Sequence, residues 1–135
     1  MTQSNILVVE DDDSIRLLLT ETLKETAGVT VDAARDGVDA LHHVTTQRYA
    51  VVILDVMMPH MTGIDFLDSL EAMVKDPSIK GVPELPAVIV ITGAPPDQIP
   101  SNALEDRFPS MVRHVLRKPI DVHELTRCVE AALRR

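Results

Sequence analysis

The sequence of 135 residues contains one cysteine and no tryptophan, and aromatic residues make up only 2% of it. Because Cys128 has no second cysteine to pair with, an internal disulfide and a zinc site of several cysteines are both excluded. Basic residues are also scarce, 13 against 21 acidic ones, and the formal net charge is −8. Such a chain repels a phosphate backbone and offers few rings for base stacking, so we expect no direct binding of nucleic acid.

Long apolar segments are missing as well. The longest apolar runs, such as residues 50–54 and 87–91, are far shorter than the roughly 20 residues of a membrane span. The first five residues lack the charged and apolar regions of a signal peptide. Hydrophobic residues still make up 45% of the chain, which is enough for one sizeable core. We therefore expect one soluble, cytoplasmic domain over residues 1–135, with no contact to a membrane.

Five short apolar runs recur along the chain. They comprise residues 6–9, 29–33, 50–54, 87–91 and the weaker 111–116. The first, third and fourth runs are apolar throughout and rich in β-branched residues, which is typical of parallel strands covered on both faces. The second run alternates, with Val29, Val31 and Ala33 on one side, as expected of a half-exposed edge strand.

The segments between these runs carry apolar residues at helical spacing. The predicted stripes are Ile15, Leu18, Leu19 and Leu23; Val38, Leu41 and Val44; Phe66, Leu70, Met73 and Val74; and Val122, Leu125, Val129, Ala132 and Leu133. Asp36, Thr62 and Asp121 stand where helix N-caps are expected, each with an acidic residue three positions on. Strands that alternate with helices predict an α/β protein with one doubly wound sheet of five parallel strands and helices on both faces.

Prolines interrupt this pattern in one stretch. Six of the nine prolines lie between Pro77 and Pro100. We expect a loop over Pro77–Pro86, and the later prolines limit the fourth helix to a short one near residues 101–107.

Polar residues follow the apolar runs directly. Glu10 and Asp11 follow the first run, Asp55 the third, Thr92 the fourth and Lys118 the fifth. In an open α/β sheet, ligands bind beyond the carboxyl ends of the strands. Parallel strands would therefore bring these five side chains into one small site.

The carboxylates of such a site need a counter-ion. Two of them about 5 Å apart repel by about 3 kcal/mol at an effective dielectric constant of about 20. Oxygen ligands without a thiolate or an imidazole favour a hard cation such as Mg²⁺. A carboxylate nucleophile beside a metal ion, an ammonium and a hydroxyl makes a suitable set for receiving a phosphoryl group.

Four motifs occur in order, each at the end of an apolar run. They are the sequences ILVVEDD at residues 6–12, DVMMPHMTG at 55–63, TG at 92–93 and KP at 118–119. With them the chain resembles, over essentially its whole length, the receiver domain of the two-component response regulator family. The resemblance implies a flavodoxin-like sheet with strand order 2-1-3-4-5.

The resemblance also implies a role for each site residue. Asp55 would be the phosphoacceptor, Thr92 would donate a hydrogen bond to a phosphoryl oxygen, and Lys118 would pair with the phosphoryl group. Mg²⁺ would be bound by Glu10, Asp11, Asp55 and the backbone carbonyl of Met57. Pro59 and Gly63 would shape the loop after the third strand, and Pro119 would follow Lys118 through a cis peptide.

Some positions depart from the family pattern. The family often has Tyr or Phe three residues before its lysine as a switch that reports phosphorylation, and here that residue is Val115. Met57 and Ala94 occupy two positions that tune the lifetime of the phosphoryl group in the family. Because neither side chain can position an attacking water, we expect slow self-dephosphorylation.

The resemblance implies a signalling switch rather than an enzyme. Its partners would be a sensor histidine kinase or a histidine phosphotransfer protein, and possible downstream protein targets. The sequence shows no output domain after Arg135. We take this to fit a phosphorelay intermediate that passes the group to a second histidine protein, and equally a stand-alone effector or an excised receiver domain. A non-phosphorylated adaptor of the same fold stays open because of Val115. A phosphatase with an aspartate nucleophile usually has a second Asp two residues on, where this chain has Met57.

Several conspicuous residues have simpler structural explanations. Asp12 and Asp13 suit the N-cap and the first turn of a helix. The five histidines show no zinc-like pairing, and Cys128 has the spacing of a core residue.

Overall fold

The computed structural model describes residues 4–26, 28–57, 61–76, 78, 85–94 and 102–134. Their elements are, in order, β1 (Ser4–Val9), α1 (Asp13–Lys24), β2 (Val29–Ala34), α2 (Gly37–Thr46), β3 (Val51–Asp55), α3 (Gly63–Lys75), β4 (Ala87–Thr92), α4 (Ala103–Arg107), β5 (Val112–Arg117) and α5 (Val122–Leu133). The strands form one parallel five-stranded sheet with the order β2-β1-β3-β4-β5. The predicted fold class and the flavodoxin-like strand order are thus confirmed.

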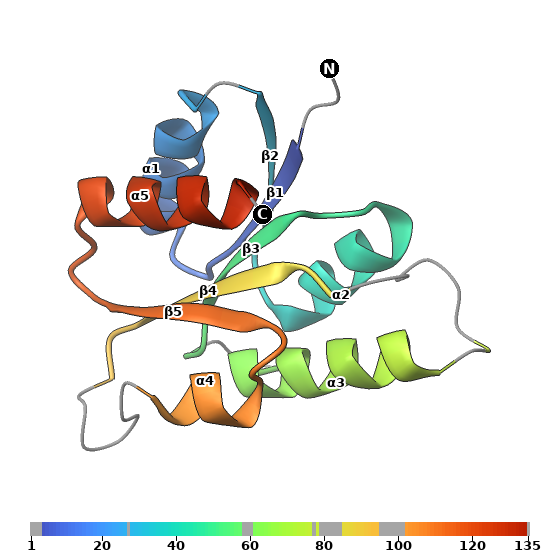
Figure 1. The fold of residues 1–135 in the computed structure, drawn as a ribbon. Coiled ribbons are helices and arrows are strands. Elements are labelled where there is room, and N and C mark those ends of the chain that lie inside the picture. Colours follow the sequence, from blue (N-terminus) through green and yellow to red (C-terminus); the bar gives the residue numbers. More distant parts are fainter. Residues whose placement is uncertain are drawn as a thin grey trace.

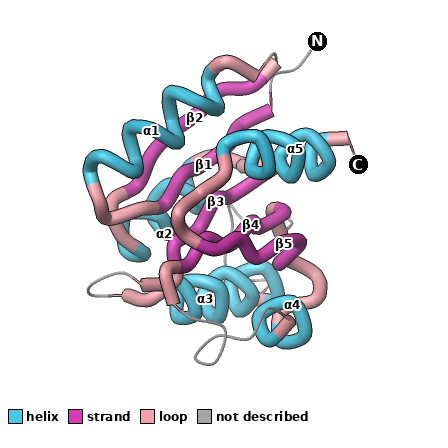
Figure 2. The backbone as a smooth tube through the Cα atoms, turned by 90° about the vertical axis from the view of Figure 1, so that its left-hand side faces the viewer, coloured by secondary structure: helices cyan, strands magenta, loops and turns pink. Residues whose placement is uncertain are grey.

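Helices cover both faces of the sheet. Figures 1 and 2 show α1 and α5 on one face and α2, α3 and α4 on the other. The sheet separates two apolar clusters: one contains Phe66 and Leu70 of α3, and the other contains Leu19 of α1 and Leu125 of α5. Strands β1, β3 and β4 contribute buried side chains to both clusters, which explains why their sequences are apolar throughout. No described helix is both long and apolar enough to cross a membrane.

The helices begin where the sequence places capping residues. Asp36 accepts a hydrogen bond from the backbone N–H of Asp39, and Thr62 accepts one from Asp65. Asp121 caps α5 in the same way, and Asp12 caps α1 through the N–H of Ile15. The capping interpretation of Asp12 is therefore confirmed.

Two residues of the predicted apolar stripes are exposed, and for them the prediction was wrong. Leu18 of α1 is 51% exposed and Val38 of α2 is 57% exposed. On α1 the buried face runs through Leu19 and Leu23, four residues apart, and Leu18 lies about 100° around the helix from Leu19. On α2 the buried face contains Gly37, Ala40 and Val44, and Val38 lies outside it.

The proline-rich stretch is only partly described. The short helix predicted near residues 101–107 is observed as α4, Ala103–Arg107. Most of the predicted loop over Pro77–Pro86, together with Pro95, Pro96 and Pro100, lies outside the described residues.

The strand ends position the polar residues. Asp55 and Thr92 are the last residues of β3 and β4. The sequence predicts that each comes directly after its strand, so each strand ends one residue later than expected. In the sheet register Asp55 pairs with Ile91, and Thr92 pairs with Arg117. Because all the strands run in the same direction, their carboxyl ends form one rim, and the residues after Val9 and Arg117 join it there.

Candidate functional site

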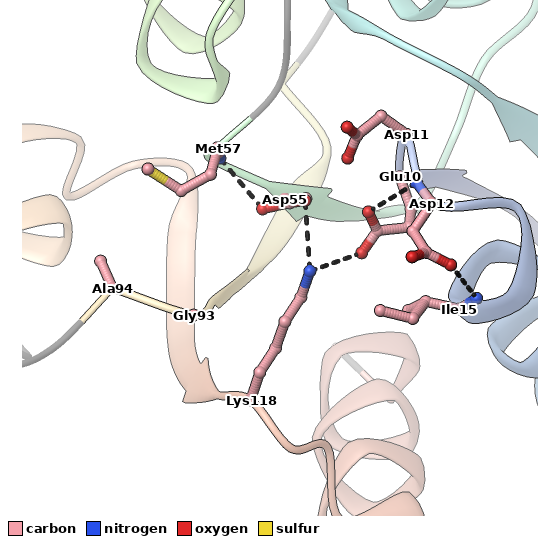
Figure 3. A pocket seen from close by; sticks show the side chains of 9 residues that line it. All are labelled: Glu10, Asp11, Asp12, Ile15, Asp55, Met57, Gly93, Ala94 and Lys118. Atoms are coloured by element: carbon pink, nitrogen blue, oxygen red, sulfur yellow. Dashed lines mark hydrogen bonds and ion pairs between the residues drawn. The ribbon is translucent and has the colours of Figure 1, made fainter.

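An open pocket of about 430 Å³ lies at this rim (Figure 3). Its lining residues are Glu10, Asp11, Asp12, Ile15, Asp55, Met57, Gly93, Ala94 and Lys118. They come from the end of β3, from the start of α1 and from the segments that follow β1, β3, β4 and β5. Of the predicted site residues, the pocket therefore brings together Glu10, Asp11, Asp55, Met57 and Lys118.

Lys118 joins two of the carboxylates. Its Nζ forms an ion pair with Glu10 Oε1 at 2.9 Å, without the geometry of a directed hydrogen bond, and donates a hydrogen bond to Asp55 Oδ2 at 3.3 Å. Burial disfavours the charged ammonium, but the two carboxylates outweigh this effect and raise the pKa of Lys118 above its usual value. The lysine is therefore held as a fixed positive charge inside the pocket.

Asp55 is oriented through both of its oxygens. The backbone N–H of Met57 donates to Oδ1 at 3.0 Å, while Oδ2 faces Lys118. The residue is only 1% exposed although it lines the pocket. A carboxylate whose two oxygens are held in place at the wall of a pocket is suited to attack a group that enters from the pocket.

Glu10 is fully buried and held at several points. Its Oε2 accepts a hydrogen bond from the N–H of Asp12 at 3.1 Å. Its backbone carbonyl accepts one from Nη1 of Arg16 at 3.0 Å, so α1 is fastened to the end of β1. Arg16 was not singled out from the sequence, because an arginine within a helix carries no motif that would reveal this contact.

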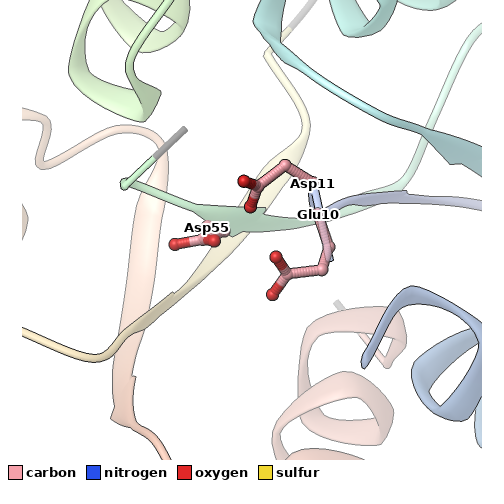
Figure 4. A group of neighbouring side chains, drawn as sticks. All are labelled: Glu10, Asp11 and Asp55. Carbon is pink, nitrogen blue, oxygen red and sulfur yellow. The ribbon is translucent and has the colours of Figure 1, made fainter. Parts of the chain in front are cut away.

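The three acidic residues form a compact cluster (Figure 4). Glu10, Asp11 and Asp55 each offer one oxygen, and these oxygens all lie within 4.8 Å of one another. Partial burial and the neighbouring Glu10 raise the pKa of Asp11. Three carboxylates face a single ammonium, and a donor set of oxygens alone fits a hard divalent cation. The cluster could therefore hold a metal ion.

Thr92 lies at the rim but is not among the described residues that line the pocket. Its side chain is fully buried, and its Oγ1 accepts a hydrogen bond from the N–H of Ala94 at 3.0 Å. Its carbonyl accepts one from the N–H of Lys118 at 2.8 Å. The structure thus places Thr92 beside Lys118, with its hydroxyl oxygen bound to the loop that follows β4.

Gly63 permits a close contact behind the site. Its N–H donates to the carbonyl of Val56 at 3.2 Å, and a Cβ at this position would lie 2.6 Å from the Cα of Val56. The start of α3 can therefore pack directly against the end of β3. The Lys118–Pro119 peptide is cis as predicted, whereas Pro59 lies outside the described residues.

Two further residues of β5, Val115 and Arg117, lie close to the site. Val115, at the position where the family often has an aromatic residue, is partly buried against the apolar cluster beneath α2, α3 and α4. Arg117 donates from Nη1 to the carbonyl of Ala94 at 2.8 Å. Arg117 was missed in the sequence because a residue before the lysine has no distinguishing spacing.

Two curated relatives that match this chain are a transcriptional regulatory protein and a sensor protein. The transcriptional regulatory protein HprR of Escherichia coli K12 is 32% identical over 132 residues, which are 96% of this chain and 51% of HprR. The sensor protein EvgS of the same strain is 44% identical over 66 residues, which are 49% of this chain and 5% of EvgS. This chain spans about half the length of HprR and a small part of EvgS.

A solved structure and a family model agree with these matches. The response regulator protein TrrA from Thermotoga maritima, solved in complex with Mg²⁺-BeF, superposes with a TM-score of 0.73 and 26% identity, over 96% of this chain and 99% of TrrA. Residues 6–130 match the model of the response regulator receiver domain. The chain therefore belongs to the response regulator receiver domain family.

Proposed function

We propose that the protein is a signalling phosphoacceptor in which Asp55 takes a phosphoryl group from a phosphohistidine of a sensor histidine kinase or a histidine phosphotransfer protein. The observation that carries the proposal is the position of Lys118, whose Nζ contacts both Glu10 and Asp55 inside the pocket. A structural aspartate at a strand end would need no buried acidic partner and no shared lysine.

The transfer is a displacement at phosphorus. A carboxylate oxygen of Asp55 forms a new O–P bond while the N–P bond of the phosphohistidine breaks, and the imidazole leaves with the electron pair and takes up a proton. The N–H of Met57 and the ammonium of Lys118 hold Asp55 in position for this attack. Lys118 then stands next to the negative charge of the bound phosphoryl group, where a fixed cation contributes most.

The acidic cluster supports a requirement for Mg²⁺. Glu10, Asp11 and Asp55 would bind the ion through carboxylate oxygens. Membership of the receiver family implies the backbone carbonyl of Met57 as a further ligand. The bound ion would supply positive charge against the phosphoryl oxygens. Without a cation, the three carboxylates oppose the arrival of an anionic donor, because Lys118 offsets only one of their charges. TrrA, which shares the fold, is itself in complex with Mg²⁺-BeF.

We further propose that the protein is modified rather than acting as a phosphatase. Met57 and Ala94 line the pocket, and neither side chain carries a carboxylate or an amide that could orient a water molecule. The acyl phosphate would therefore persist until a partner removes it.

The decisive experiment is incubation with Mg²⁺ and acetyl phosphate, followed by intact mass measurement. We expect one added phosphate in the parent protein and none in Asp55→Asn. Asp65→Asn is the matched control, because Asp65 is an exposed acid in the first turn of α3, and it should retain the adduct. An unmodified parent, or an equal adduct in Asp55→Asn, would overturn the proposal and would favour a non-phosphorylated adaptor.

A further inference from the structure

Arg117 connects β5 to the loop that follows β4. Its Nη1 donates to the carbonyl of Ala94 at 2.8 Å, and its backbone pairs with Thr92 in the sheet register. The guanidinium is charged and the carbonyl is neutral, so this is a charge-assisted hydrogen bond, which is shorter and stronger than a bond between two neutral groups. The contact therefore holds Ala94, a residue of the pocket lining, against the last residue of β5.

Ala94 in turn holds Thr92. The N–H of Ala94 donates to Oγ1 of Thr92 at 3.0 Å, and Thr92 is fully buried. A hydroxyl oxygen that accepts this bond keeps its own proton available as a donor. The carbonyl of Thr92 is tied at the same time to the N–H of Lys118 at 2.8 Å. Arg117, Ala94 and Thr92 thus form a continuous chain of contacts that ends at the rim formed by the strand ends.

We propose that Arg117 is a positioning residue for phosphoryl acceptance: by holding the carbonyl of Ala94, it keeps the Thr92 hydroxyl in one orientation at the rim. The inference rests on the proposed function, because it assigns Thr92 as a donor to the phosphoryl group.

The test compares three variants in which Asp55 is left unchanged. Arg117→Met removes the donor and keeps an apolar stem, Arg117→Lys keeps one donor, and Arg127→Met removes an exposed arginine of α5 as the matched control. We expect Arg117→Met to slow formation of the acetyl phosphate adduct about fivefold, the order of effect of one lost hydrogen bond. Arg117→Lys should restore most of the rate, and Arg127→Met should match the parent.

Two further measurements separate positioning from a general loss of structure. Amide hydrogen exchange of Ala94, followed by NMR in the unphosphorylated protein, should be faster in Arg117→Met than in the parent and in Arg117→Lys. In a Thr92→Val background, Arg117→Met should slow adduct formation much less than it does in the parent, because both changes then act on the same donor. If Arg117→Met and Thr92→Val slow adduct formation by factors that simply multiply in the double variant, the inference is overturned.

The outcomes distinguish this inference from the proposed function. An Arg117→Met variant that forms the adduct at the parent rate would overturn the role of Arg117, while Asp55 would stay the acceptor. Slower adduct formation with unchanged exchange at Ala94 would overturn it as well, because the effect would then not pass through Ala94. If the parent forms no adduct, the proposed function fails, and the exchange at Ala94 still reports whether Arg117 orders the loop.

Discussion

Lys118 reaches Asp55 across 63 positions of the sequence, and its Nζ lies 3.3 Å from Oδ2 of the aspartate. The side chain of the lysine is 24% exposed and that of the aspartate 2%. A pair with one nearly buried partner leaves an uncompensated charge when the other partner is removed. The contact therefore links the stability of the protein to the charge balance of its site.

Replacing Lys118 tests this charge balance. We expect Lys118→Met to lower the free energy of unfolding by about 2 kcal/mol in the absence of divalent cations, because Glu10 and Asp55 lose their ammonium. Added Mg²⁺ should stabilise this variant more than it stabilises the parent, since the ion would then be the main counter-charge. Urea unfolding with and without Mg²⁺ measures both effects.

Lys75→Met is the control for the loss of a lysine. Lys75 is an exposed residue of α3 whose Nζ lies 3.7 Å from Glu71 Oε1. Its loss should change the free energy of unfolding by less than about 0.5 kcal/mol. Equal Mg²⁺ effects in Lys118→Met and the parent would show that Lys118 does not compensate the acidic cluster.

The lifetime of the acyl phosphate depends on the residues beside Asp55. We expect slow loss of the phosphate from the isolated parent and about tenfold faster loss in Met57→Asn, because an amide could orient a water molecule toward phosphorus. Met57→Leu should behave like the parent. Intact mass measured over time after removal of the donor follows all three proteins, and rapid loss from the parent would contradict the prediction.

Tyr49 gives the protein a defined response to alkaline pH. Its ring is buried, and its hydroxyl donates to Asp32 Oδ2 at 2.7 Å. Burial, followed by the hydrogen bond and the charge of Asp32, raises the pKa of Tyr49 above its usual value of about 10. The unfolded chain therefore loses this proton first, so the contribution of Tyr49 to stability is complete below pH of about 10 and declines as the pH rises further.

This response can be measured cleanly because Tyr49 is the only tyrosine. The phenolate absorbance should appear together with unfolding rather than before it. Tyr49→Phe should cost about 1 kcal/mol of unfolding free energy at neutral pH and should lose this part of the alkaline dependence. Ionisation near pH 10 in the folded protein would contradict the assignment.

Gly63 and Gly93 differ in whether their surroundings leave room for a side chain. A Cβ at Gly63 would lie 2.6 Å from the Cα of Val56, whereas at Gly93 the nearest described atom would be Lys118 Cδ at 3.8 Å. We expect Gly63→Ala to lower the free energy of unfolding by about 2 kcal/mol, because the start of α3 must move away from β3. Gly93→Ala should be nearly neutral by the same urea measurement, and equal losses would refute the explanation.

Exposed leucines of α1 allow a test of where a protein donor contacts this domain. Leu17 and Leu18 of α1 are 61% and 51% exposed, and Ile15, about one turn before Leu18, lines the pocket. On the proposed function, we expect a phosphohistidine donor that reaches Asp55 to contact this end of α1, because Ile15 lines the pocket. Leu17→Glu and Leu18→Glu should each slow phosphoryl transfer from such a donor about tenfold, while the rate with acetyl phosphate stays unchanged.

Val38→Glu is the matched control for these leucines. Val38 is 57% exposed and lies on α2, on the opposite face of the sheet. It should leave both transfer rates unchanged. If the leucine variants slow both donors equally, the effect lies in the pocket and not in partner contact.

The sequence predicts which residues lie at the site better than it predicts the hydrogen bonds between them. Glu10, Asp55 and Lys118 could be placed at one rim because each follows an apolar run and parallel strands end on the same side. The orientation of the Thr92 hydroxyl toward Ala94, and the contacts of Arg16 and Arg117, depend on side-chain rotamers that no spacing encodes.

The helix faces were likewise only partly predictable. A helical period defines a stripe to within about one position, so Leu18 and Val38 at the stripe edges could not be distinguished from buried neighbours. The strand runs carried a stronger signal, because a strand covered on both faces has no polar side. The cytoplasmic location and the absence of nucleic acid binding stay predictions from composition.

The separation of the interior into two apolar clusters by the sheet has an evolutionary consequence. Helices on one face can change length, sequence or angle without repacking the other face, and neither change needs to move the strand ends. Substitutions can therefore alter the outer surface of one helix layer while the positions of the strand ends at the rim stay the same.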